Sequence, residues 1–529
     1  MEIITDQKYL EKLTQHFGVA IGNFDGFHLG HQKLLENFVN SCKKQGILSV
    51  VMSFEPHPSI YLGNISSDYL LNSKENKKKQ LESVGVDILL ELPFDDEIRE
   101  LSAKEFIKEY LLSNNNISYL HLGHDFKLGK GKEDAFNLIE NIKKDVKVHK
   151  EEPFKLNNEI VSSTKIREYL KKNLSLANKM LGTPYRLEGV VVSGKGIGKK
   201  KLYPTANIKI DEIRKIPSLG VYITKTIIEG ESYESVTNIG LNPTISEGNK
   251  LTIESYLLFS FGNFYEKFAQ VEFLEKIRDE KKFDSIDLLR TQISKDVEKS
   301  KNYFRKKSSI KLALIGRDIQ HSKSQVVYEK LLQRAVDYDL LDYESQSEIP
   351  SAENLLEKYD GISITAPYKT HFEKYAQNSY SMVNTLYKKD QGVMATNTDA
   401  TAVEKIITEY LAMGKNSFII LGDGSMSKLL TQILKKKNLK FMVLSRKEKN
   451  LDQIDQKIKD NLNNLVVVNT CARTYTYTGL KNLAYEFWDM NYGLEKHSEY
   501  FKNTGVTYTD GSELLELQAK YALNYWNLN

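Results

Sequence analysis

The stretch "VAIGNFDGFHLGHQKLL", Val19 to Leu35, joins an apolar strand to an amphipathic helix through a glycine-rich turn. Two histidines, His28 and His31, lie three residues apart where this helix begins. Free backbone N–H groups and the helix dipole favour an anion there, and two imidazoles would add donors for a phosphate. The same residues are also compatible with an ordinary helix N-cap and two histidines on the surface. A metal site would need a third ligand, and none lies at suitable spacing.

The pattern outward from this stretch predicts three domains. Residues 1–180 alternate short apolar strands ("LSVVMSF", "VDILLEL", "ISYLHLG") with helices, which predicts a doubly wound parallel α/β sheet. Residues 181–306 alternate strands and turns ("RLEGVVVSG", "LTIESYLLF"), which predicts a small antiparallel β-barrel closed off by a helix. Residues 307–529 return to strands followed by helices ("LALIG", "FIILG", "LVVVN"), which predicts a second, two-lobed α/β region.

The composition excludes several classes of protein. A net charge of +4 over 529 residues does not indicate a nucleic-acid partner. The two cysteines, Cys42 and Cys471, lie far apart and fit a reducing cytoplasm rather than a disulfide scaffold. The charged N-terminal stretch does not resemble a signal peptide, and no apolar run reaches the roughly 20 residues of a membrane helix. We therefore expect a cytoplasmic protein without a membrane partner.

The opening stretch resembles the GNFDGxHxGH signature of nucleotidyltransferases, in which the histidine pair binds ATP phosphates. "MSFEPHP" (52–58), "LGHDFKLGKGK" (122–132) and "VSSTKIREYL" (161–170) follow in the order found in bacterial bifunctional riboflavin kinase/FAD synthetases. By itself, "SSTKIR" is a plausible start of a helix. The resemblance implies that His28, His31 and Arg167 are catalytic. It also implies cofactor-binding roles for Gly22, Asn23, Asp125, Phe126, Ser163 and Thr164.

The barrel region carries the second half of this resemblance. In "GKGIGKKKLYPTANI" (194–208), Thr205 and Asn207 lie two apart on one strand, so their side chains face the same way and could ligate Mg²⁺ beside a nucleotide. The resemblance to riboflavin kinases implies that Glu254 is the base acting on the ribityl hydroxyl. The sequence departs from the riboflavin kinase pattern at two places. Lys201-Leu202 precedes "YPTAN", and "LLFSFGNFYEK" lacks the family's acidic pair and glycine. The glycines that let the backbone approach phosphates are Gly194, Gly196 and Gly198.

Residues 307–529 resemble shikimate dehydrogenases less closely. The segments concerned are "LIGRDIQHSKS" (314–324), "GISITAPYK" (361–369), "MVNTL", "TNTDA" and "LLELQAKYAL". The resemblance implies a catalytic pair, Lys369 and Asp399, that moves a proton at a hydroxyl whose carbon gives up hydride. The substrate-binding residues implied are Ser322, Ser324, Thr365, Asn384 and Gln518.

The cofactor loop of this region departs from its family. In "FIILGDGSMSKLL" (418–430), Gly422 and Gly424 follow a strand and open a helix, which is the context of a dinucleotide turn. Asp423 places a negative charge near the expected phosphates, and Met426 and Ser427 add bulk. Arg446 in "LSRKEK" suits the 2′-phosphate of NADP. We expect a recognisable substrate pocket with an impaired NADP site.

These features predict FAD biosynthesis. Residues 1–306 would use ATP and Mg²⁺ to phosphorylate riboflavin to FMN and to adenylylate FMN to FAD. One alternative is a trifunctional protein that also reduces 3-dehydroshikimate with NADPH, with a shikimate-like molecule as a further partner. Others are a flavin- or nucleotide-binding protein without catalysis and another HxGH adenylyltransferase. The "PTAN" motif and the glutamate downstream of it argue against both the non-catalytic binding protein and the other HxGH adenylyltransferase.

Overall fold

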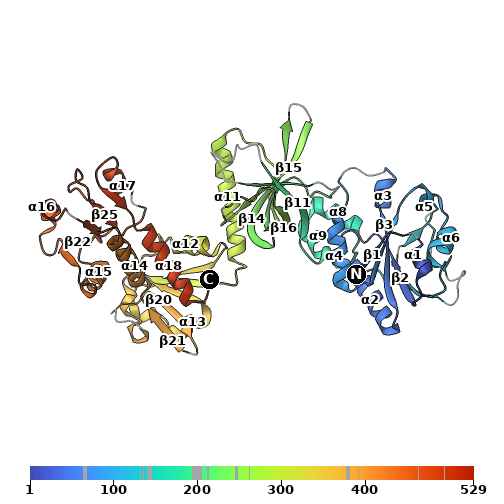
Figure 1. Ribbon diagram of the computed structural model, residues 1–529, viewed down its shortest axis with the longest axis horizontal. Coiled ribbons are helices and arrows are strands. Elements are labelled where there is room, and N and C mark those ends of the chain that lie inside the picture. The colour runs from blue at the N-terminus through green and yellow to red at the C-terminus, as the bar shows by residue number, and fades with distance from the viewer. Residues whose placement is uncertain are drawn as a thin grey trace. The chain divides into compact units, whose positions relative to one another are not determined.

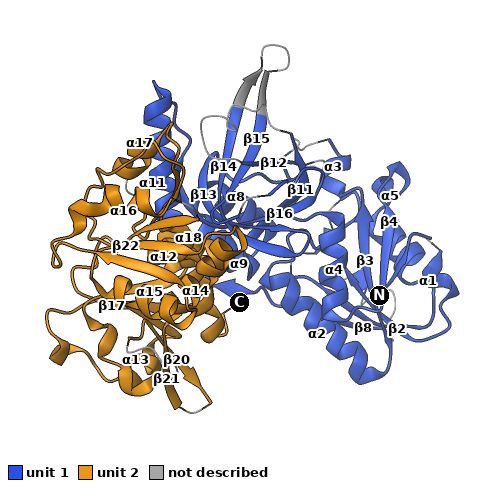
Figure 2. Cartoon of the chain, turned by 60° about the vertical axis from the view of Figure 1, so that its left-hand side comes forward, with its two compact units in different colours: residues 1–300 blue, residues 301–529 orange. Residues whose placement is uncertain are grey.

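The computed structural model describes residues 1–6, 8–63, 68–124, 126–131, 133–134, 136, 138–139, 146–193, 205–210, 214–244, 248–260, 262–376, 382–390, 392–462, 464–493 and 495–528. The chain divides into two compact units, residues 1–300 and residues 301–529 (Figure 2). Within the described ranges, no helix is long and apolar enough to cross a membrane. The domain boundaries at 180/181 and 306/307 stay predictions.

A six-stranded parallel sheet forms the first part of unit 1 (Figure 1), in the order β1-β4-β3-β2-β5-β8. The predicted doubly wound α/β sheet is therefore confirmed. Its four inner strands are the apolar runs of the sequence, whereas the two edge strands are short and more polar. The strands are β1 (Glu2–Ile4), β2 (Phe17–Ile21), β3 (Leu48–Glu55), β4 (Ile88–Pro93), β5 (Ile117–Leu122) and β8 (Lys147–Lys150).

Helices cover both faces of this sheet because its inner strands are apolar on both sides. On one face, α2 (Leu29–Gln45) and α4 (Lys74–Val84) bury Phe38 and Leu81 against Ala20 and Tyr119. On the other, α1 (Tyr9–Lys12), α5 (Asp96–Glu100) and α6 (Ala103–Phe106) complete a second core. The smaller elements are α3 (Pro58–Tyr61), a π-helical turn (Ile107–Leu111), α8 (Ser163–Lys172), α9 (Leu174–Leu181), β6 (Lys127–Leu128), β7 (Glu133–Asp134), β9 (Lys155–Leu156) and β10 (Glu159–Ile160).

A closed antiparallel barrel follows, in the order β11-β12-β15-β14-β13-β16, which confirms the predicted barrel. Apolar side chains fill part of its interior, and five fully buried hydroxyls fill the rest and hydrogen-bond to one another at 2.6–2.9 Å. These hydroxyls belong to Thr224, Thr226, Ser235, Thr237 and Ser255. The elements are β11 (Tyr185–Val192), β12 (Ala206–Lys209), β13 (Gly220–Ile228), β14 (Glu231–Thr244), β15 (Gly248–Leu257), β16 (Phe268–Asp279) and the helix α11 (Ile286–Arg305).

Unit 2 contains two five-stranded sheets, which confirms the predicted two-lobed α/β region. The first, β18-β17-β19-β20-β21, is mixed: β17 (Lys311–Gly316) pairs in parallel with β18 (Asp337–Asp342) and β19 (Gly361–Ile364), and antiparallel pairing adds β20 (Thr385–Lys389) and β21 (Gly392–Thr396). The second is parallel, β23-β22-β24-β25-β26. Its strands are β22 (Ser417–Leu421), β23 (Lys440–Leu444), β24 (Leu465–Asn469), β25 (Glu486–Asp489) and β26 (Thr507–Thr509).

The order of the second sheet reverses direction between β22 and β24, which is where ligands bind in open α/β sheets. The helices of unit 2 are α12 (Ser324–Leu332), α13 (Ala352–Lys358), α14 (Thr398–Ala412), α15 (Ser425–Lys436), α16 (Ile454–Asp460), α17 (Glu495–Phe501) and α18 (Ser512–Tyr525). Short 3₁₀ turns cover Gln346–Glu348, Tyr368–Thr370, Glu373–Tyr375 and Leu451–Gln453.

Candidate functional site

The two histidines of the opening stretch lie together at the first turn of α2. His28 is the N-cap residue of this helix, and its Nδ1 accepts a hydrogen bond from the backbone N–H of His31 at 3.2 Å. The two imidazole rings stack with centroids 3.6 Å apart. Because Nδ1 of His28 is an acceptor, the proton of the neutral ring is on Nε2. The pair therefore offers an N–H donor beside the positive end of the helix dipole.

Two buried polar atoms in this turn have no hydrogen-bond partner among the described residues. They are Nδ1 of His31 and the side-chain oxygen of Asn23. Buried atoms of this kind usually have partners, so an unpaired pair in one turn marks a place where a ligand completes the bonding. Burial lowers the pKa of His31 well below its usual value, and the charges of His28 and Arg167 lower it further. His31 is therefore neutral near pH 7.

Asp25 ties this turn to helix α8. Its carboxylate is 7% exposed and accepts hydrogen bonds from the backbone N–H groups of Leu71 (2.8 Å) and Asn72 (3.1 Å) and from Nη2 of Arg167. Ser163 at the start of α8 donates its hydroxyl to the backbone oxygen of Asp25 at 2.7 Å. Sequence reasoning did not assign Asp25 a role, although it lies within the quoted signature. Its position in "GNFDG" was the available signal.

Arg167 is held on three sides. Its Nε donates to the backbone oxygen of Tyr69 at 3.0 Å, and its guanidinium lies 3.7 Å from the centre of the Tyr69 ring. The contact with Asp25 completes the set. The side chain is 12% exposed, so little water screens this ion pair. The predicted catalytic arginine therefore lies beside the HxGH turn, oriented by an acidic partner that the sequence did not reveal.

The remaining cofactor-binding residues predicted within positions 1–180 lie at several different places in the sheet domain. Gly22 follows strand β2 directly, and its N–H donates to the backbone oxygen of Met52 at 3.0 Å. Thr164 is exposed on the first turn of α8. Phe126 is partly buried and packs against the core on the sheet face away from α2. Asp125 lies outside the described residues, so its expected contact with the flavin stays a prediction.

The barrel brings Thr205, Asn207 and Glu254 to one face. Asn207 on β12 lies directly opposite Glu254 on β15 in the antiparallel ladder. Their neighbours Ala206 and Ser255 point into the barrel, so Asn207, Glu254 and Thr205 lie on the outer face. Burial raises the pKa of Glu254 above its usual value. The glycines 194, 196 and 198 lie outside the described residues.

In unit 2, the seven residues that the sequence assigned to substrate binding and catalysis line one cavity of about 230 Å³. Lys369 donates from Nζ to a carboxylate oxygen of Asp399 at 2.5 Å, and both side chains are largely buried. Other residues that line the cavity were not predicted as substrate contacts, among them His321, Met426 and Tyr492. The seven are Ser322, Ser324, Thr365, Lys369, Asn384, Asp399 and Gln518.

The predicted dinucleotide turn lies at the carboxyl end of β22. Gly422 has φ +106°, and a Cβ there would lie 2.8 Å from the hydroxyl of Thr470, so this position requires glycine. Gly424 is the N-cap residue of α15. Arg446 is exposed, with its guanidinium 5.9 Å from the ring centre of Tyr475. A second cavity of about 420 Å³ lies along α15, and Asp423, Ser427 and Lys447 are among its lining residues.

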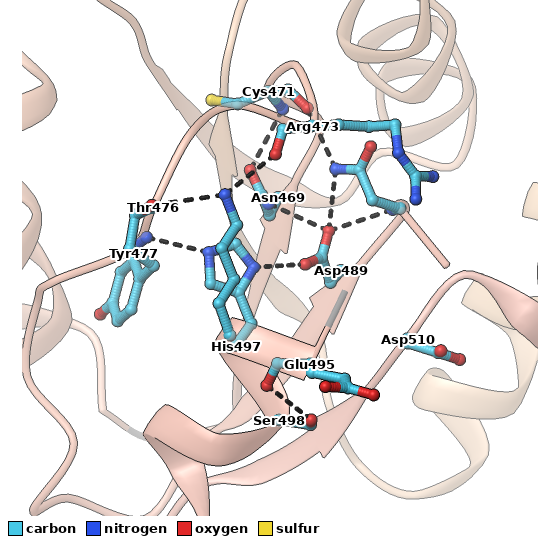
Figure 3. Close-up of polar contacts among 12 residues, drawn as sticks. Asn469, Cys471, Arg473, Thr476, Tyr477, Asp489, Glu495, His497, Ser498 and Asp510 are labelled. Carbon is cyan, nitrogen blue, oxygen red and sulfur yellow. Dashed lines mark hydrogen bonds and ion pairs between the residues drawn. The ribbon is translucent and has the colours of Figure 1, made fainter. Parts of the chain in front are cut away.

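A buried polar network holds the loop that follows β24 (Figure 3). Asp489 and His497 are fully buried, and Nδ1 of His497 lies 2.6 Å from the carboxylate of Asp489. The other ring nitrogen accepts the backbone N–H of Tyr477 at 3.0 Å. Asn469 donates to the same carboxylate and accepts from the N–H of Cys471. Because both nitrogens of His497 have protein partners, this Asp–His pair is a structural support and not a catalytic dyad.

Comparison with known proteins places these features in context. Residues 10–165 match the FAD synthetase family, and residues 181–304 match the riboflavin kinase family. The bifunctional riboflavin kinase/FMN adenylyltransferase of Buchnera aphidicola subsp. Schizaphis graminum is 38% identical over 311 residues, which cover 58% of this chain and 99% of that protein.

Two solved structures are also similar. One, described as a macrolide-efflux protein from Streptococcus pneumoniae, is 30% identical with a TM-score of 0.52, and the match covers 57% of this chain and 98% of that one. The other is a chorismate mutase/shikimate 5-dehydrogenase fusion protein from Clostridium acetobutylicum. It is 21% identical with a TM-score of 0.34, and the match covers 42% of this chain and 92% of that one.

Proposed function

This chain belongs to the family of bifunctional riboflavin kinase/FMN adenylyltransferases, and we propose that its adenylyl transfer depends on His28, His31 and Arg167. Its activities are the ATP-dependent phosphorylation of riboflavin to FMN and the adenylylation of FMN to FAD. The observation that supports the residue roles best is the stacked histidine pair at the first turn of α2, with Arg167 tied to the same turn through Asp25.

In the adenylyl transfer, an oxygen of the FMN phosphate attacks the α-phosphorus of ATP. The bond between the α-phosphorus and its bridging oxygen to the β-phosphate breaks, and pyrophosphate leaves. Negative charge grows on the phosphate oxygens during this step, so preorganised donors stabilise the transition state. Nε2–H of His28, neutral His31 and the guanidinium of Arg167 supply such donors. Ser163, Thr164, Gly22 and Asn23 would position the triphosphate, and Asp125 and Phe126 the flavin.

In the barrel, we assign Thr205 and Asn207 to Mg²⁺ and Glu254 to the general base. A hydroxyl and an amide oxygen beside a carboxylate are the hard oxygen donors that Mg²⁺ prefers. A bound Mg²⁺ would neutralise charge on the phosphates of ATP. Glu254 takes the proton of the ribityl hydroxyl, whose oxygen attacks the γ-phosphorus as ADP leaves. The raised pKa of Glu254 brings its basicity closer to the working pH, which favours this role. The loop glycines 194, 196 and 198 would cradle the phosphates.

One experiment tests both assignments. The purified full chain is incubated with riboflavin, ATP and Mg²⁺, and FMN and FAD are separated by chromatography. With His28→Ala, FMN should accumulate and FAD should fall by about 10²–10³-fold, because one preorganised donor is lost. With Glu254→Gln, FMN should not form from riboflavin, whereas supplied FMN should still become FAD. FAD formation at the parent rate by the His28 variant would refute the first assignment.

For residues 307–529, we propose a pocket for a small hydroxylated carboxylate of the shikimate kind. The convergence of seven residues on one cavity, with Lys369 against Asp399, supports this proposal. The pair could move the proton of a substrate hydroxyl, and the serine hydroxyls of Ser322 and Ser324 could bind the carboxylate.

For the same residues we also propose that NADP binds poorly at the turn of Gly422 and Gly424, with Arg446 facing its 2′-phosphate. Asp423 lies in that turn, and the bulk of Met426 lies at the substrate cavity. The full chain is mixed with NADP⁺ and shikimate, and NADPH absorbance is followed. Slow or absent turnover is expected, and turnover at a rate normal for dehydrogenases would refute the impaired site.

A further inference from the structure

Two histidines and a glutamate converge at the edge of the unit 1 sheet. His121 on β5 and His149 on the edge strand β8 are register partners in the parallel ladder, so their side chains lie beside each other. Glu151 lies two residues beyond His149, and its backbone N–H donates to the oxygen of Leu122, so the ladder continues to it. Residues two apart on a strand share a face. The sheet therefore delivers all three side chains to one place.

The three side chains are close enough to share one ion. One ligand atom from each lies within 4.8 Å of the others. Nε2 of His121 is 2.7 Å from a carboxylate oxygen of Glu151, and Nε2 of His149 is 3.7 Å from the same oxygen. Ligands of a tetrahedral zinc ion, with bonds of about 2.0–2.2 Å, lie about 3.3–3.6 Å apart. To reach that geometry, the 2.7 Å contact must lengthen by about 0.6 Å, and a pair up to 4.8 Å apart must close by up to about 1.2 Å. Among the described residues, this is the one such group of three or more.

We propose that His121, His149 and Glu151 bind a divalent transition-metal ion, with Zn²⁺ as the ion the ligand set suits best. Two imidazoles and a carboxylate are a common zinc ligand set that leaves a fourth position for water. His149 lies at the open edge of the sheet and its side chain is 50% exposed, so an ion and a water can enter. This site uses none of the residues assigned above to adenylyl transfer or to the kinase reaction.

The surroundings of the three ligands match those of metal sites. A metal-bound histidine donates its other N–H to a nearby acceptor, and Nδ1 of His121 lies 3.0 Å from the hydroxyl of Tyr119. The amide of Asn37 on α2 donates to Glu151 at 2.9 Å and orients its carboxylate. His121 is 1% exposed, so packing holds its ring in place beside Glu151.

Metal binding requires one tautomeric change. Without an ion, Nε2–H of His121 can donate to Glu151 while Nδ1 accepts from Tyr119. With an ion, the ring proton is on Nδ1 and donates to the Tyr119 oxygen, and the Nε2 lone pair is on the metal. The ion replaces one hydrogen bond by bonds that tie β5 to the edge strand β8.

The test uses the full chain after removal of metals with a chelator. Zn²⁺ is titrated against a chromophoric competitor, and Co²⁺ is added separately to read its visible spectrum. We expect one tight Zn²⁺ site per chain and the absorption bands of tetrahedral Co²⁺. Loss of an outer-shell partner costs about 10–100-fold in affinity, so His149→Ala, which removes a ligand, should weaken binding by more than about 100-fold.

The matched control is His16→Ala, because His16 is an exposed histidine of the same sheet domain that bonds instead near the start of β5. Its variant should bind Zn²⁺ as the parent does. Far-UV circular dichroism of each variant in chelator checks that it is folded. Glu151→Gln gives a second ligand deletion that does not depend on the exposed histidine. Unchanged affinity in both ligand variants, or no Zn²⁺ binding by the parent chain, would overturn the proposal.

Discussion

The pairing of Asp25 with Arg167 yields a prediction that links folding to the adenylyl transfer. Asp25→Asn keeps the size of the side chain and removes its charge. The guanidinium of Arg167, 12% exposed, then faces an amide, and the N–H groups of Leu71 and Asn72 lose a charged acceptor. Removing one partner of a buried pair costs about 3–5 kcal/mol. At about 1.36 kcal/mol per tenfold, that cost raises the equilibrium constant for local opening by about 10²–10⁴-fold.

Backbone hydrogen exchange of the full chain measures this cost locally. Peptides covering residues 68–73 contain the two N–H donors, and their protection should fall by about 10²-fold or more in the variant. FAD formation should fall as well, because Arg167 loses its orientation, whereas FMN formation in the barrel provides an internal control. Ser163→Ala is the matched comparison, since it removes a hydrogen bond to the backbone of Asp25 and leaves the ion pair. Its effect on exchange should be about tenfold.

A double-mutant cycle separates the ion pair from general disruption. Arg167→Gln alone leaves the buried carboxylate of Asp25 unpaired. The variant that combines Asp25→Asn with Arg167→Gln leaves neither charge unpaired. Its loss of free energy of unfolding should therefore be about 1–3 kcal/mol smaller than the sum of the two single losses. Additive costs would refute the claim that the two side chains act as a pair. Parent-like protection of residues 68–73 in Asp25→Asn would refute the claim that this pair supports the HxGH turn.

Four further predictions follow from single contacts. His31→Ala should lower FAD formation by about 10²–10³-fold and spare FMN formation, measured by flavin chromatography. Burial raises the folded-state pKa of Glu254, so stability is lost as pH rises from the unfolded-state pKa through the folded-state pKa. Glu254→Gln should therefore raise the Tm at pH 7. A pH series of melting curves should show this advantage over the parent vanish only below the unfolded-state pKa, where the glutamate is protonated in both states. Thr226→Val breaks the barrel's hydroxyl network and should cost about 1–3 kcal/mol in urea unfolding, whereas Thr226→Ser should keep the hydrogen bonds and cost less. Lys369→Met leaves the carboxylate of Asp399 unpaired, so the unfolding midpoint of unit 2 should drop while flavin synthesis continues; an unchanged midpoint would contradict the buried pair.

The strand, turn and helix around His28 were predictable from the sequence because local chemistry determines them. An apolar run, a glycine turn and a 3.6-residue period specify a strand followed by a helix without reference to the rest of the chain. The histidine pair and the side-by-side placement of Thr205 and Asn207 depend on the same short spacings. The antiparallel barrel and the two sheets of unit 2 also agree with the predicted fold class, whereas the order of the barrel strands was not predicted. Short polar edge strands such as β8 carry no such pattern.

The family resemblance grouped the seven cavity residues of unit 2 in advance, but only the tertiary structure showed which other distant side chains meet. Arg167 lies 142 positions from Asp25, and nothing local in either segment specifies that they pair. The same is true of His121, which meets His149 only because β8 pairs with β5 at the sheet edge. His497 lies in the mostly polar helix "EKHSEYF" (α17), yet packing buries it fully against Asp489. Periodicity fixes the direction of a side chain relative to its own strand or helix, whereas the order and register of strands determine which side chains meet.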